Sequence, residues 1–89
     1  QSAIMNITRS DGKNIPFAAD IYDEQGNVIG NVGQGGQAFV RGIEQQGNIS
    51  IKWLEQSKPV SCLAHYQQSS EAEKIAQSII LNGIRCQIQ

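Results

Sequence analysis

Cys62 and His65 stand in a Cys-x-x-His spacing. A cysteine and a histidine this close in sequence could form a nucleophile with its base, or two ligands of a metal site. On a strand, positions three apart point to opposite faces, so the two side chains would diverge. A structural zinc site needs four ligands, whereas the chain has two cysteines and one histidine. We therefore expect neither a thiolate–imidazole pair nor a metal site, and we expect His65 to be a solvated strand residue.

The two cysteines, Cys62 and Cys86, stand 24 positions apart. In a small domain, an even cysteine count at this spacing favours a disulfide and an oxidising compartment. Two buried free thiols in a cytosolic protein are the alternative. The spacing alone leaves both interpretations open.

Carboxylates and glycines give no signal for catalysis or cofactor binding. Asp23 and Glu24 lie in a turn, where aspartate is favoured for its backbone hydrogen bonds. The segment Gly33-Gln34-Gly35-Gly36 is similar to a phosphate loop, but it lacks Lys-Ser/Thr and precedes a strand instead of a helix. We expect a hairpin with glycines at positive φ, no acid–base catalysis and no cofactor.

Length and composition indicate one ordinary soluble domain. The 89 residues carry a net charge of −1, with scattered charges and no basic stripe, so nucleic-acid binding is not expected. The longest apolar run, Ile79-Ile80-Leu81, is far shorter than the roughly 20 residues of a membrane-spanning helix. The N-terminus has no signal-peptide pattern, which fits a processed chain or one that begins within a larger protein.

Turn residues recur every 8–12 positions, the rhythm of a β-sandwich or barrel. Alternation predicts that Ile49 and Ile51 face a core with Trp53, and that Phe17 shares a buried strand face with Ile21. A turn is expected at residues 45–48. The expected strands are 3–8, 17–22, 28–32, 38–43, 48–54 and 60–66.

The tail carries two conflicting patterns. Residues 70–73 form a passable capping box, and apolar residues follow at helical spacing from Ala72 to Ile80, which predicts a helix over 71–81. The alternative is strand at 78–81 and 84–88, which would bring Cys86 alongside Cys62. We favour a loop with one helical turn, followed by strand.

A series of turn, glycine, aromatic and cysteine positions runs in order along nearly the whole chain: Ser10-Asp11-Gly12-Lys13, Pro16-Phe17, Gly26, Gly30, Val32 to Gln37, Arg41-Gly42, Gly47, Trp53, Cys62, Tyr66 and Cys86. In this series the chain resembles the C-terminal periplasmic domain of outer-membrane ushers, the assembly platforms of the chaperone–usher pilus pathway. The family often has glycine where this chain has Ala18 and Leu54, and alanine at the first position suggests a negative φ there.

The resemblance implies an all-β fold, a small antiparallel Greek-key-like β-sandwich of about six to seven strands. It implies a Cys62–Cys86 disulfide that staples the sandwich. Residues 1–89 would be a single periplasmic domain, excised from a larger outer-membrane protein and not itself embedded in the membrane. It would bind chaperone–pilus subunit complexes and other domains of the same usher, with no catalysis, cofactor or metal, and would be a monomer in isolation.

For the partner-binding surface, the sequence offers Phe39, Arg41 and Ile43 on one strand face, with Tyr22 as an extension. An aromatic, an arginine and an aliphatic residue together are typical of interfaces, although core residues beside a solvated arginine give the same pattern. Two other functions compete with this one. The first is a carbohydrate-binding or transthyretin-like accessory module, which five aromatic residues argue against, and the second is an enzyme with Cys62 as nucleophile.

Overall fold

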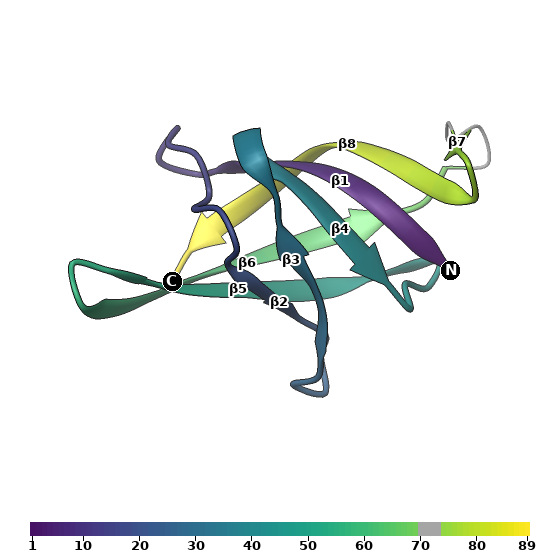
Figure 1. Ribbon diagram of the computed structural model, residues 1–89. Helices are drawn as coiled ribbons and strands as arrows, with labels where there is room; N and C mark the ends of the chain where they lie inside the picture. Colours follow the sequence, from purple (N-terminus) through teal and green to yellow (C-terminus); the bar gives the residue numbers. More distant parts are fainter. Residues whose placement is uncertain (70–73) are drawn as a thin grey trace.

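A computed structural model describes residues 1–69 and 74–89, which form β-strands joined by turns and one 3-10 turn (Figure 1). The six predicted strands are present: three are two or three residues longer than expected, one has the expected bounds, and two are shorter. The elements are β1 Ser2–Arg9, β2 Asp20–Tyr22, β3 Val28–Val32, η1 Gln34–Gly36, β4 Gln37–Arg41, β5 Gln46–Glu55, β6 Lys58–Gln67, β7 Lys74–Ile75 and β8 Ser78–Ile88.

These strands make one sheet that closes on itself. The order is β1-β4-β3-β2-β5-β6-β8, and β8 pairs back onto β1 to complete a ring of seven strands within the described residues, while β7 pairs with the start of β8 outside the ring. The fold is all-β, as predicted, but it is a closed barrel and not a Greek-key sandwich. Nor is it wholly antiparallel, because β1 and β8 run parallel (Figure 1). Local strand patterns could not distinguish these architectures, because closure depends on the two ends of the chain meeting.

Alternating side chains of the strands fill the barrel. In β5, Ile49 and Ile51 are fully buried and Trp53 is 9% exposed, as the alternation predicts. The predicted turn at 45–48 is displaced: the chain reverses at 42–45, and β5 already begins at Gln46. The core also contains Ala3, Met5, Ile7, Ile15, Ala19, Ile21, Val32, Ala38, Val40, Ile43, Cys62, Ala64, Tyr66, Ile79, Leu81, Ile84 and Cys86.

The segment before β2 departs from the prediction. Ala18 has φ of +69°, so the expected negative φ is wrong. Its backbone N–H donates to the Val32 carbonyl at 2.7 Å, which holds the chain in this left-handed conformation. Because that residue interrupts the extended backbone, the alternation does not continue from β2, and Phe17 is 69% exposed instead of being a core residue.

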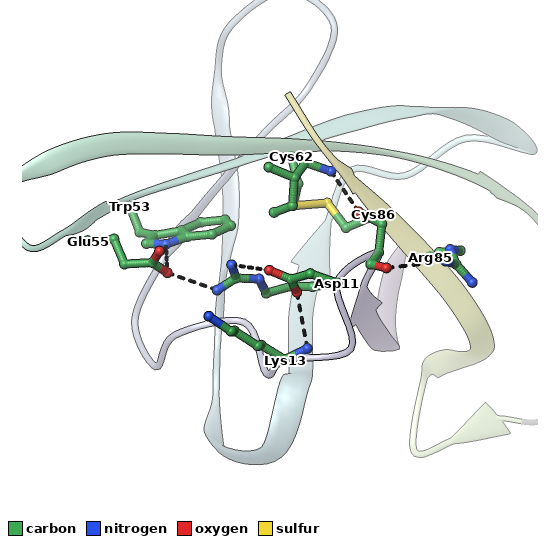
Figure 2. A network of polar contacts seen from close by, with 10 residues as sticks. Asp11, Lys13, Trp53, Glu55, Cys62, Arg85 and Cys86 are labelled. Carbon is green, nitrogen blue, oxygen red and sulfur yellow. Dashed lines mark hydrogen bonds and ion pairs between the residues drawn. A yellow bond between two sulfur atoms is a disulfide. The ribbon is translucent and has the colours of Figure 1, made fainter.

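The tail confirms the favoured interpretation of strand from Ser78 onward. Lys74–Ile75 and Ser78–Ile88 form a hairpin, so neither the helical alternative nor a helical turn is present over residues 74–81, and the capping box at 70–73 lies outside the described residues. Pairing with β1 from Ser78 to Cys86 outweighs the local helical spacing. It also brings β8 against β6, where the Cys62–Cys86 disulfide forms with both residues at 0% exposure (Figure 2).

Candidate protein-binding surface

An apolar row crosses the outside of β4, β1 and β8. Ile4 of β1 is paired with Phe39 of β4 on one side and with Ile80 of β8 on the other. All three occupy outward positions, since their strand neighbours are core residues. Phe39 is 49% exposed, and Ile4 and Ile80 are half-buried. The barrel thus presents contiguous apolar side chains from three adjacent strands.

A groove of about 260 Å³ includes Phe39 and Ile4 of this row, but not Ile80, and it reaches the polar row beside it. The polar row has the same register, with Arg41 opposite Ser2 and Ser2 opposite Ser78. Within the described part of the chain, Arg41 makes no ion pair. The groove therefore combines apolar side chains with one positive charge that no described acid pairs with, and it is lined by Ser2, Ala3, Ile4, Phe39, Val40, Arg41 and Ser78.

The Phe39 ring packs against Gly33. A Cβ at this position would lie 2.8 Å from Cε2 of Phe39, so the ring occupies the space that the missing side chain leaves. The Gly33 N–H donates to the Gln37 carbonyl at 2.7 Å and closes the hairpin below the ring. The next turn fits the predicted glycine hairpin, since Gly35 and Gly36 both have positive φ. An exposed aromatic ring is thereby held in one place.

The four residues predicted for partner binding do not lie together. Phe39 and Arg41 are both exposed and line the groove. Ile43 is only 6% exposed, because the chain turns inward after β4 and its N–H donates to the Gln1 carbonyl. Ile43 belongs to the core, so the prediction that it lies on the exposed face with Phe39 and Arg41 is wrong. Tyr22 is half-buried on β2, with Lys52 Nζ 4.8 Å from its ring centroid, and it is not part of the groove.

Sequence reasoning missed Ile4 and Ile80. Each stands between two core residues in its strand, so alternation could have placed it outward. What the sequence did not supply is their adjacency, because it depends on a parallel pairing between the first and last strands of the ring.

A second cluster of charged groups surrounds Arg9, which is 6% exposed at the end of β1. Its partners Asp11, Glu55 and Trp53 are labelled in Figure 2. Its guanidinium donates to Glu55 Oε1 at 2.9 Å and to Asp11 Oδ2 at 2.7 Å, and it lies 5.1 Å from the Trp53 ring centroid. Trp53 Nε1 also donates to Glu55 Oε1, at 3.2 Å. The guanidinium Nε is buried without a hydrogen-bond partner among the described residues. The charged and polar groups of this cluster bond mainly to one another, which indicates that its role is to hold β1 against β5.

The cluster shifts the carboxyl groups toward ionisation. Hydrogen bonds from Arg9 and Trp53 lower the pKa of Glu55. The backbone N–H of Lys13, together with Arg9, lowers the pKa of Asp11. Carboxylates that are ionised at neutral pH can neutralise the buried arginine, but they have no proton to donate to a substrate.

The residues first considered for chemistry are separated. Cys62 is buried in its disulfide, whereas His65 is exposed on the opposite face of β6 with its ring 3.1 Å from Asn48 Oδ1. Across residues 1–69 and 74–89, no three His, Cys, Asp or Glu side chains are arranged to hold a metal ion. No helix in those ranges is long and apolar enough to cross a membrane.

The model of the PapC C-terminal domain family matches residues 4–70. The outer membrane usher protein HtrE of Escherichia coli strain K12 is 99% identical over 89 residues, which cover 100% of this chain and 10% of that protein. The probable outer membrane usher protein LpfC' of Escherichia coli O157:H7 is 34% identical over 74 residues, covering 80% of this chain and 15% of that protein. The chain thus spans only about a tenth of the length of such relatives.

Two solved structures share the fold. The Caf1A usher C-terminal domain, whose conserved hydrophobic surface clusters are described as important for F1 antigen assembly, superposes with a TM-score of 0.77 at 23% identity, covering 99% of this chain and 98% of that one. The C-terminal domain of the PapC usher has a TM-score of 0.73 at 21% identity, covering 98% and 99%.

Proposed function

The chain belongs to the PapC C-terminal domain family of outer membrane ushers, and from this premise we propose that it binds chaperone–subunit complexes during pilus assembly. The role is one of binding, with no catalytic step. Residues 1–89 act as one domain of a larger outer-membrane protein, on its periplasmic side. Other domains of the same usher are further partners.

The observation that carries this proposal is the outward apolar row of Phe39, Ile4 and Ile80. Aromatic anchors beside an arginine are enriched at the centres of protein interfaces. The hydrophobic surface clusters described for the Caf1A domain support the same role for this row. A groove of about 260 Å³ is small, which suits a complex that must be released as each subunit moves on.

The carbohydrate-binding alternative is less well supported. Stacking on sugars requires exposed aromatic rings, and Trp53 is 9% exposed and engaged by Arg9. Phe17 and Phe39 are exposed but lie on different elements, Phe17 before β2 and Phe39 in β4. We therefore propose a protein partner instead of a glycan.

The test is a titration of this domain with a purified chaperone–subunit complex from its own pilus system. Phe39→Ala should weaken binding about tenfold, because truncating a central aromatic anchor typically costs 1–2 kcal/mol or more. Leu54→Ala is the matched control, since Leu54 is 71% exposed and lies outside the groove. Equal affinities for wild type and Phe39→Ala, or no binding by the wild type, would refute this function for the surface.

A further inference from the structure

We propose that the partner segment in this groove carries an acidic side chain two residues from an apolar one. The acid pairs with Arg41, and the apolar side chain packs on Phe39 and Ile4. This inference deepens the proposed function and rests on it, since it names the chemistry of the segment that the groove binds.

The register sets the spacing between the two contacts. Arg41 and Phe39 are two positions apart on β4, so their outward side chains are separated by about 7 Å along the strand. An extended partner has the same repeat, which places its residues i and i+2 on one side and above the two rows. The matching partner is an extended segment reading acidic-x-apolar or apolar-x-acidic.

Arg41 differs from the other arginines of the chain in having no bond to a described acid or carbonyl. Arg9 is buried between two carboxylates, and Arg85 donates to the Ser10 carbonyl at 3.3 Å. Beside Arg41 in the polar row stand Ser2 and Ser78, whose hydroxyls can donate to a carboxylate without adding charge. Apolar side chains along the groove exclude water, which strengthens an ion pair formed at its edge.

Overall charge does not supply this attraction. The chain has a net charge of −1, so an acidic partner gains nothing from the molecule as a whole. Any attraction comes from Arg41 alone. It should raise the association rate constant, and this effect should decrease as the salt concentration rises, as is usual for charges at the edge of an interface.

The experiment measures association and dissociation rates of the chaperone–subunit complex on the immobilised domain at low and high salt. Arg41→Gln should lower the association rate constant about threefold to tenfold at ~0.05 M salt, with the difference disappearing near ~0.5 M. Arg41→Lys, which keeps the charge, should stay close to wild type at low salt. Lys58→Gln is the matched control, because it removes one exposed positive charge at the β5–β6 hairpin, outside the groove.

The outcomes separate this inference from the function on which it rests. If Phe39→Ala weakens binding but Arg41→Gln behaves like Lys58→Gln at low salt, the acidic partner is refuted and the proposed function stands. A loss in Arg41→Gln of equal size at both salt concentrations also refutes the charge pairing. If neither variant affects binding, the surface itself is refuted. Unfolding midpoints of the variants, matched to wild type, exclude misfolding as the cause.

Discussion

The Cys62–Cys86 disulfide should supply a large part of the stability of this domain. The bond joins β6 to β8 with 24 residues of separation, and the described ladder between those strands has three paired positions. We consider its removal in two ways: reduction of the wild type, and the double substitution Cys62→Ala with Cys86→Ala. Both release the same loop, and the substitution also excludes re-oxidation.

The expected magnitude follows from loop-closure entropy. A loop of this length restricts the unfolded chain by about 3.5 kcal/mol at 25 °C. A chain of 89 residues has a total unfolding free energy of about 4 to 13 kcal/mol, so the bond accounts for a quarter or more of it. For a domain of this size, the loss corresponds to a fall in the unfolding midpoint of about 14 to 28 °C.

Thermal unfolding followed by circular dichroism, with oxidised and reduced wild type in matched buffers, measures this fall. A decrease of less than about 5 °C would refute the loop-entropy reasoning. Burial adds an independent check, because both cysteines are 0% exposed and reduction must follow opening of the barrel. The reduction rate should therefore rise with urea, and rapid reduction of the folded protein without denaturant would contradict the burial.

Three further predictions concern Ala18, Gly33 and the carboxylates around Arg9. Ala18→Gly should raise the unfolding free energy by about 0.5–1 kcal/mol by relieving the left-handed alanine, and an unchanged urea midpoint would contradict this. Gly33→Ala, at an ordinary φ, should lower the unfolding free energy slightly, because its Cβ would lie 3.1 Å from the Gln37 carbonyl oxygen. It should also weaken partner binding by displacing the Phe39 ring, and unaltered binding would show that the position of this ring is unimportant. The two carboxylates that bind Arg9 have lowered pKa values in the folded state, so their stabilisation, complete above about pH 5, should be lost as the pH falls below about 4. Unfolding midpoints across pH 2–7 measure this, and Arg9→Met should flatten the acid limb of the curve.

Elements governed by local alternation were predictable from the sequence. The strand containing Ile49, Ile51 and Trp53 needs no information beyond its own residues, because a period of two specifies which side is buried. The disulfide pairing followed from the family resemblance, since spacing alone left free thiols open. It was confirmed because β8 does lie against β6.

Elements governed by distant pairing were predicted only in part: strand near the C-terminus was favoured over a helix, but its parallel pairing with β1 was not foreseen. Helical spacing in the tail is a local signal, and a parallel partner strand at the other end of the chain outweighs it. The apolar row depends on the same pairing, so Phe39 and Arg41 were identified on β4 but Ile4 and Ile80 were not. Phe17 and Ile43 were misplaced for a different reason: each lies just beyond a strand end, where alternation no longer determines direction.

The parallel contact of β1 with β8 also determines when this domain can fold. Side chains 76 residues apart, such as Asn6 and Asn82, meet across that pair, so the ring closes only after nearly the whole segment has been synthesised and delivered. A chain cut short before β8 would leave β1 and β6 with open edges and Cys62 without its partner, a state prone to aggregation and proteolysis. A chain that lacks either β1 or β8 therefore cannot complete the ring.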